Sequence, residues 1–291
     1  MVACSKRLIE SLNMRTNKAI MKPIATSLAV AMAVAMIGSA TAQAAPCGNN
    51  AAGFSAWLQD FKGRAKSSGI SQSTIDRALA GVTYDSGVIG RDRSQKSFKL
   101  SFEDFYARRV GSYLLDKARA KMKTHAGVLA SIEKRYGVPP QILVSIWGLE
   151  TNFGADGAGK YSIIRSIATL AYDCRRSEFF NGHLMAALRI VQKGDMSPEQ
   201  MRGGWAGEIG QVQFLPGSYD KYAVDFNGDG RRDLVHTVPD ILASTANFMK
   251  GHGWQRGAPW GPGTANYGVI KDWNKADVYA RTIAVMAEKL R

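Results

Sequence analysis

One acidic residue of this chain is predicted to lie on the apolar side of a helix. The stretch PPQILVSIWGLETNFG, residues 139–154, opens with two prolines, which suit a first helical turn, and Gly154 supplies a stop. Ile142, Ile146 and Glu150 recur at four-residue spacing and therefore share one face. Burial and the negative end of its own helix would raise the pKa of the Glu150 carboxyl group. A carboxylic acid that keeps its proton near neutral pH is the proton donor that glycosidic bond cleavage needs. The alternative is a structural Glu that caps or bridges within the fold.

Three motifs, in the same order along the chain, resemble one known family. ILVSIWGLETNFG, then AGEIGQVQFLPGSY, then YAVDFNGDGRRDL resemble the signatures of the lytic murein transglycosylases of the membrane-bound B type. The similarity runs from about Cys47 to the C-terminus. The resemblance implies a mainly α-helical, lysozyme-like fold with minor β structure. It also implies an enzyme that cleaves the bond between N-acetylmuramic acid and N-acetylglucosamine in peptidoglycan without water.

The resembled reaction explains why a single carboxyl group can suffice. An ordinary glycosidase uses two carboxylates. In the resembled family the muramoyl 6-hydroxyl attacks its own anomeric carbon and leaves a 1,6-anhydro end, and an internal nucleophile has a high effective concentration. Glu150 would then act as both acid and base. Asp156 and Glu208 are candidates for a second carboxylate only because they are near the motifs. A muramidase that hydrolyses the same bond would need a positioned water, and a non-catalytic murein-binding protein would not depend on Glu150.

The resemblance also implies residues that bind the substrate. Gln213 matches a substrate-contacting glutamine, although a buried amide that braces a turn is the alternative. Relatives often have a serine where this chain has Gly204, so a hydroxyl contact there is lost or replaced. Trp273, Asn274 and Tyr279 match a C-terminal cluster of Tyr, Asn and Tyr. Trp273 keeps a face for stacking on a sugar but has no hydroxyl group, and Asn274 would equally well cap the last helix.

Two neighbouring arginines are further candidates for substrate binding. Arg175 and Arg176 match an arginine pair that faces the peptide and lactyl side of the substrate in the resembled family. A guanidinium group suits carboxylates because it can form two parallel hydrogen bonds. The alternative is that one or both arginines pair with Asp173 or Glu178 at the surface.

An acidic loop over residues 225–240 resembles an EF-hand. Carboxylate, amide and carbonyl oxygens at this spacing can bind calcium. The twelfth position, normally a bidentate Glu, is His236, and the resembled family closes a longer loop with a late Asp. A metal-free turn of Asp and Gly residues is the alternative. The candidate calcium ligands are Asp225, Asn227, Asp229, Arg231 (through its carbonyl group) and Asp240. Apart from calcium at this loop, the sequence indicates no cofactor, and none is required for the expected reaction.

The N-terminus resembles a secretory signal. Lys18 and Lys22 precede an apolar run over residues 24–37, and small residues follow, so we expect residues 1–42 to be a cleaved signal peptide and the rest to act in the periplasm. A retained signal anchor is the alternative. The run is short for a membrane span, so we expect no stable membrane insertion after cleavage. The two cysteines that remain, Cys47 and Cys174, favour a disulfide in an exported protein, although two buried thiols are possible.

The formal net charge of +14 indicates an anionic partner. The positive residues are scattered, which argues against nucleic acid, and we expect a monomer that acts on peptidoglycan glycan strands.

Helical patterns dominate, and we expect an N-terminal helical region over residues 43–125 that packs on a catalytic domain over residues 126–291. Residues 85–97 and 154–160 are predicted to be loops, and Ser197 is predicted to begin a compact helix.

Overall fold

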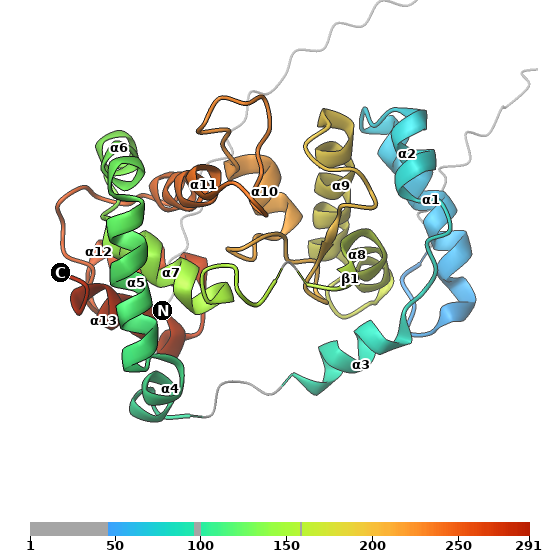
Figure 1. Ribbon diagram of the computed structural model, residues 1–291. Helices are drawn as coiled ribbons and strands as arrows, with labels where there is room; N and C mark the ends of the chain where they lie inside the picture. The colour runs from blue at the N-terminus through green and yellow to red at the C-terminus, as the bar shows by residue number, and fades with distance from the viewer. Residues whose placement is uncertain (1–45, 96–99, 158) are drawn as a thin grey trace, which may run out of the picture. The chain divides into compact units, whose positions relative to one another are not determined.

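The computed structural model describes residues 46–95, 100–157 and 159–291, and helices make up most of this part (Figure 1). The predicted signal peptide lies outside the described residues. Residues 43–291 form one compact unit. The elements are η1 (Ala51–Gly53), α1 (Phe54–Ser67), α2 (Gln72–Ala78), α3 (Ser86–Ser94), α4 (Phe102–Arg109), α5 (Ser112–Thr124), α6 (Ala126–Tyr136), α7 (Pro140–Thr151), β1 (Tyr161–Ser162), α8 (Ile163–Tyr172), α9 (Ser177–Lys193), β2 (Arg202–Gly203), α10 (Pro216–Tyr222), α11 (Val238–Gly251), α12 (Ala265–Trp273) and α13 (Asp277–Glu288).

Helix α7 is the central helix of one group, because α5, α6, α11 and α13 all pack against it (Figure 1). Pro139 and Pro140 begin it, as predicted. It ends at Thr151 rather than at the predicted Gly154, because the next residue, Asn152, adopts a left-handed conformation with φ 50°. Every residue from Ile142 to Leu149 is buried. The predicted one-sided apolar stripe is therefore wrong in one respect: α7 is buried on all its faces, and Glu150 lies at its end.

A second group of helices forms around α8 and α9. These two helices pack on each other, α10 and α2 pack on α9, and α1 and α3 pack on α8 (Figure 1). The Tyr172 ring at the end of α8 contacts the rings of Phe54, Trp57 and Tyr84. Aromatic side chains far apart in the sequence thus attach the N-terminal helices to the middle of the chain.

A small β region connects the two groups. Strands β1 and β2 pair in antiparallel register, with Tyr161 opposite Gly203, and Ile209 bridges to both Gly203 and Phe214. Gly203 must be a glycine, because a Cβ atom there would overlap with the carbonyl oxygen of Glu208. This tight pairing fixes the backbone of the AGEIGQVQF motif.

Two local predictions are wrong, and one helix was missed. The charged stretch after Asp85 forms helix α3 rather than a loop, because the Asp85 side chain accepts hydrogen bonds from the backbone N–H groups of Gly87 and Val88. Ser197 begins a single turn, closed by the Met201 N–H, rather than a helix. Helix α12 was not predicted. In the described part of the chain no helix is long and apolar enough to cross a membrane.

Candidate active site

A cleft of about 870 Å³ lies between the two groups of helices. Five of the predicted functional residues line it, namely Glu150, Arg176, Gln213, Trp273 and Asn274. Further aromatic side chains also line it, among them Phe179, Phe248 and Trp205. The cleft therefore combines one helix-end carboxyl group with amide, guanidinium and aromatic groups, a composition suited to a carbohydrate chain with charged substituents.

Two donors hold the Glu150 side chain from one side. The indole Nε1 of Trp273 and the hydroxyl group of Tyr279 each donate a hydrogen bond to Oε1 of Glu150, at 2.9 Å and 2.9 Å. Oε2 accepts no hydrogen bond from the described residues. When Glu150 is neutral, Oε1 must be the carbonyl oxygen because it accepts two donors, so the proton resides on Oε2. The geometry thus places the transferable proton on the free oxygen.

The environment favours the neutral form of Glu150. Burial raises the pKa of its carboxyl group, and the nearby Glu208 carboxylate raises it further, while the Trp273 and Tyr279 donors and the Arg109 guanidinium lower it. Burial is the largest of these effects. Tyr279 stays protonated, because burial and the Glu150 charge raise the pKa of its phenol well above the usual value. The elevated pKa of Glu150 agrees with the prediction from its sequence position.

Arg109 belongs to this site, and sequence reasoning missed it. It lies at the end of α4 and donates a hydrogen bond from Nη2 to the carbonyl oxygen of Leu149, beside Glu150. Its charge lowers the pKa of Glu150 and also that of Tyr279. No local signal in the sequence marks it, because it is one of several arginines near the end of a short helix.

Trp273 and Asn274 make contacts within the protein that the sequence did not predict. The Trp273 ring contacts Phe214 and Phe248, with centroids 5.4 Å and 5.1 Å apart, so packing fixes the indole N–H that reaches Glu150. Asn274 follows α12, and its Oδ1 accepts the Ala276 N–H at 3.0 Å. It does not cap the last helix, which begins three residues later. It shapes the connection between α12 and α13 instead.

Gln213 is held by its own turn. It adopts a left-handed conformation with φ 54°, and its Nε2 donates to the carbonyl oxygen of Gly210 at 2.8 Å. Its Oε1 accepts no hydrogen bond within the described residues. Non-glycine residues with positive φ are uncommon and cluster at functional sites. The amide therefore braces a turn, as one alternative predicted, and also presents an acceptor to the cleft.

Comparisons with known proteins agree with this site. Residues 53–264 match the family model described as the transglycosylase SLT domain. This chain belongs to the transglycosylase SLT family. The crystal structure of SltB3 from Pseudomonas aeruginosa, in complex with NAG-anhNAM-pentapeptide, superposes with a TM-score of 0.75. The two chains are 32% identical, and the match covers 81% of this chain and 79% of that one.

Two relatives from Escherichia coli complete the comparison. Membrane-bound lytic murein transglycosylase B (strain K12) is 44% identical over 123 residues, which cover 42% of this chain and 34% of the relative. The chain thus matches about a third of that relative's length. The lytic transglycosylase Slt35, in a structure with calcium, has a TM-score of 0.70 at 23% identity, over 80% of this chain and 92% of that one, which supports the fold alone. These findings confirm the predicted B-type family and the mainly helical, lysozyme-like fold.

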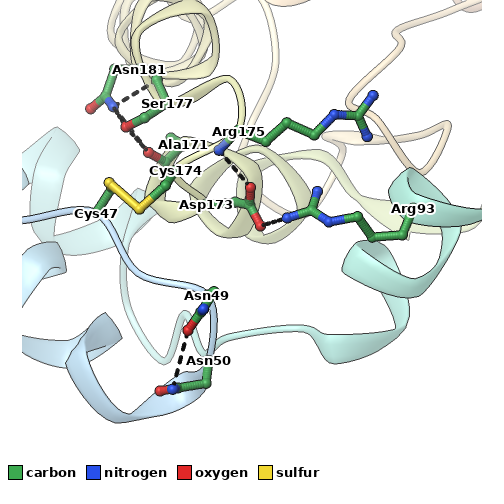
Figure 2. The surroundings of a disulfide bond; sticks show 10 residues. All are labelled: Cys47, Asn49, Asn50, Arg93, Ala171, Asp173, Cys174, Arg175, Ser177 and Asn181. Carbon is green, nitrogen blue, oxygen red and sulfur yellow. Dashed lines mark hydrogen bonds and ion pairs between the residues drawn. A yellow bond between two sulfur atoms is a disulfide. The ribbon is translucent and has the colours of Figure 1, made fainter.

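Within this SLT-family cleft, the arginine pair is held by an acidic residue that sequence reasoning did not consider. Arg175 donates to Asp92 Oδ2 at 2.8 Å, and Arg176 also pairs with Asp92, which is buried on α3. Asp173 instead binds Arg93, at 2.6 Å, and the backbone N–H of Arg175 (Figure 2). Only Arg176 of the pair lines the cleft. The ion pairs therefore hold Arg176 at the cleft, whereas Arg175 lies outside its lining.

The disulfide lies next to this ion-pair network. Cys47 and Cys174 are bonded, with Cα atoms 5.0 Å apart, and Cys174 precedes Arg175 directly (Figure 2). This is the pairing that the two-cysteine count favoured. The Gly48 N–H also donates to the Tyr172 carbonyl oxygen at 2.9 Å.

The acidic loop of this SLT-family chain directs its oxygens to its own backbone. Asp225 accepts hydrogen bonds from the N–H groups of Gly228, Asp229 and Gly230, and buried Asp240 accepts from those of Phe226 and Asp233. No group of three acidic, His or Cys side chains that could hold a metal occurs in the described part of the chain. This arrangement does not present a calcium cage. Calcium binding stays a prediction, and a calcium-dependent rise in melting temperature that is absent in Asp229→Ala would establish it.

The far end of the cleft contains a group that sequence reasoning also missed. Phe179 is 51% exposed and contacts the His183 ring, with centroids 4.5 Å apart. His183 Nδ1 accepts the Gly217 N–H at 3.0 Å, so its Nε2 carries the proton. Burial lowers the pKa of His183 to about 4, so the ring is neutral at physiological pH. An exposed aromatic face beside a fixed N–H donor suits a sugar ring.

Proposed function

We propose that this SLT-family protein is a peptidoglycan lytic transglycosylase that cleaves the β-1,4 bond between N-acetylmuramic acid and N-acetylglucosamine. The observation that carries the proposal is the geometry of Glu150: its half-buried side chain lines the cleft, and Trp273 and Tyr279 both donate to Oε1, which leaves Oε2 free to carry the proton that burial favours. That is the state a general acid needs. The name of the E. coli relative and the anhydro-sugar ligand of SltB3 support the same reaction.

The reaction needs one carboxyl group and no water. Glu150 gives its Oε2 proton to the glycosidic oxygen as the bond from that oxygen to the anomeric carbon breaks. The 6-hydroxyl oxygen of the muramoyl residue forms the new bond to the anomeric carbon, and its proton passes to the Glu150 carboxylate. The products are a free 4-hydroxyl end and a 1,6-anhydro end, and Glu150 is protonated again. The two donors on Oε1 stabilise the carboxylate that exists between the two proton transfers.

The other cleft residues bind the substrate in this proposal. Gln213 offers an amide oxygen to a sugar N–H or hydroxyl group, and Asn274 borders the same cleft. Arg176 is aligned by Asp92 to meet a lactyl or peptide carboxylate. The pentapeptide ligand of SltB3 supports a substrate with peptide carboxylates. Tyr279 and Trp273 act on Glu150 rather than on the substrate face.

The proposed setting is the periplasm. We infer export by the N-terminal signal, cleavage of residues 1–42, and action of a monomer on glycan strands. The disulfide supports an oxidising compartment, and the positive charge suits a polymer with carboxylates. The membrane-bound name of the E. coli relative supports a site of action at the cell envelope.

Glu208 favours a second candidate, a hydrolytic muramidase. It lines the same cleft as Glu150, and a second carboxyl group is what activation of a water molecule requires. Mass spectrometry of digested murein separates the two, because only the transglycosylase leaves 1,6-anhydro ends.

Glu150→Gln tests the proposed function. The amide keeps an acceptor for Trp273 and Tyr279 but has no transferable proton, so turnover should fall by about 10²–10⁴-fold or more while murein binding persists. Stability at neutral pH should hold or rise, because ionising a buried carboxyl group with a raised pKa costs stability as pH increases. Glu133→Gln, the same change on α6 away from the cleft, is the control and should leave turnover unchanged. Release of anhydro-muropeptides by Glu150→Gln at a near wild-type rate would refute the proposal.

A further inference from the structure

Glu208 occupies space that the absence of a side chain at position 204 creates. A Cβ atom added to Gly204 would overlap with Oε2 of Glu208. The Gly204 N–H donates to the Glu208 carbonyl oxygen at 3.0 Å, so the backbone fixes the two residues against each other. The pair is thus complementary: residue 204 has to be a glycine as long as the Glu208 carboxyl group lies over it.

The Glu208 carboxyl group has no cationic partner. Its Oε2 accepts the Ala206 N–H at 3.0 Å, and no Lys, Arg or His among the described residues forms an ion pair with it. Burial raises the pKa of this carboxyl group, and the backbone N–H groups of Glu208 and Ala206 lower it. It lines the same cleft as Glu150 instead of pairing with a cation.

We propose that Glu208 is a positioning residue for the reaction, whose negative charge keeps the proton on Glu150 until a glycosidic oxygen is in place. The inference rests on the proposed function. Two carboxyl groups in one poorly solvated cleft cannot both ionise cheaply. The backbone N–H groups of Glu208 and Ala206 stabilise the charged form of the Glu208 carboxyl group, and a negative charge there opposes loss of the Glu150 proton.

Other groups around Glu150 also raise or lower its pKa. Arg109 on α4 is the cation that opposes Glu208, and Tyr279 on α13 is a neutral donor. The remaining charged or titratable groups that line the cleft are Arg176, His183, Lys221, Tyr222, His252, Asp272 and Lys275. Among charged groups, Arg109 and Glu208 act most strongly on Glu150. The proton affinity of Glu150 is therefore set by burial, by the two donors on Oε1 and by one charge of each sign.

Glu208→Gln tests the charge. The amide retains an acceptor for the Ala206 N–H and fills the space over Gly204, but it is neutral at every pH. In protein labelled with ¹³C at the Glu carboxyl carbons, the Glu150 resonance, assigned by its absence in Glu150→Gln, should titrate at lower pH in Glu208→Gln than in wild type. The alkaline limb of the kcat/KM profile should move to lower pH by the same amount. An unchanged Glu150 titration would overturn the inference.

A swap of side chains separates charge from space. Gly204→Ser alone should displace the Glu208 carboxyl group and lower kcat/KM by about 10²-fold, the size expected for a misplacement of about 1 Å. The double variant Gly204→Ser/Glu208→Ala removes the overlap and should regain most of that loss at acidic pH, where Glu150 is protonated without help. Its alkaline limb should remain shifted, as in Glu208→Gln. Recovery of both the rate and the wild-type alkaline limb would show that Glu208 only fills space.

The outcomes distinguish this inference from the proposed function. Wild-type protein that produces no anhydro ends would remove the proposed function, whatever the carboxyl titrations show. Suppose that activity depends on Glu150, but that Glu208→Gln leaves the Glu150 titration and the pH profile unchanged. This result would refute only the inference about Glu208.

Discussion

The disulfide should contribute a large part of the stability of this chain. Cys47 and Cys174 are 127 residues apart in sequence, so the bond closes a long loop in the unfolded chain. The chain-entropy relation gives about 5 kcal/mol for a loop of this length at 25 °C, and measured losses on removing native disulfides are about 2–5 kcal/mol. We expect Cys47→Ala/Cys174→Ala to lower the free energy of unfolding by about 2–5 kcal/mol.

The rest of the N-terminal attachment should keep the folded state intact. The Gly48 hydrogen bond to Tyr172 and the packing of Phe54 and Trp57 on the Tyr172 ring do not depend on the disulfide. Glu150 is held by donors from α12 and α13, whereas the disulfide joins Cys47 to Cys174, in the segment between α8 and α9. Turnover below the melting temperature should therefore change less than about threefold, since no group that contacts Glu150 moves.

Urea unfolding of wild type with and without reductant, beside the double variant, measures this effect. The reduced wild type and the double variant should have the same free energy of unfolding, both below that of the oxidised wild type. The slope of the free energy with urea concentration should increase, because the unfolded chain without the bond exposes more surface. A loss below about 1 kcal/mol would refute the reasoning, because it would mean that the cross-link does not restrict the unfolded chain.

Three further predictions follow from the cleft. Arg109→Gln should move the alkaline limb of the kcat/KM profile to higher pH, because removing this cation raises the pKa of Glu150. This shift is opposite to the one expected for Glu208→Gln, and a shift to lower pH would contradict it. Phe179→Ala should weaken the binding of murein fragments about threefold to tenfold, measured by calorimetry, with little change in kcat, measured by steady-state kinetics. Tyr113→Ala, which removes an exposed aromatic ring outside the cleft, should leave this binding unchanged. Arg176→Lys should raise KM for peptide-bearing substrate more than for bare glycan, because Lys cannot form the paired hydrogen bonds of a guanidinium group; equal effects would contradict a role at the peptide.

The sequence was most informative where chemistry and local structure coincide. Glu150 was found because an acid on the apolar face of a helix is costly, and burial raises the pKa of this residue in the structure as well. Helix ends were predictable where a local signal exists: Pro140 begins α7, and Gly137 and Gly194 adopt the left-handed conformation after α6 and α9. The cysteine pairing needed only an even count and an exported chain.

The sequence was least informative where partners are distant. Helix α3 resembled a loop because it is polar, yet its Asp92 is 2% exposed and holds arginines more than 80 residues away. No pattern within one segment can reveal that a charged residue is buried by partners elsewhere. The alternative that the side chains of Arg175 and Arg176 pair with Asp173 or Glu178 is wrong for the same reason: it considered the nearest acids in sequence, while the fold provides Asp92.

The same limit applies to the proton affinity of Glu150, which is the property on which the proposed chemistry depends. Residue type and helix position predict a raised pKa, but its size is decided by groups from four segments. The charge of Arg109 on α4 lowers the pKa of Glu150, against the effect of burial, whereas Glu208, in the loop after β2, raises this pKa further. The position of Glu208 depends in turn on the absence of a side chain at Gly204. From the sequence alone, Gly204 predicted only the loss or replacement of a hydroxyl contact. A substitution at 204 should therefore change the pH dependence of a carboxyl group that it does not contact, through the side chain that fills its space.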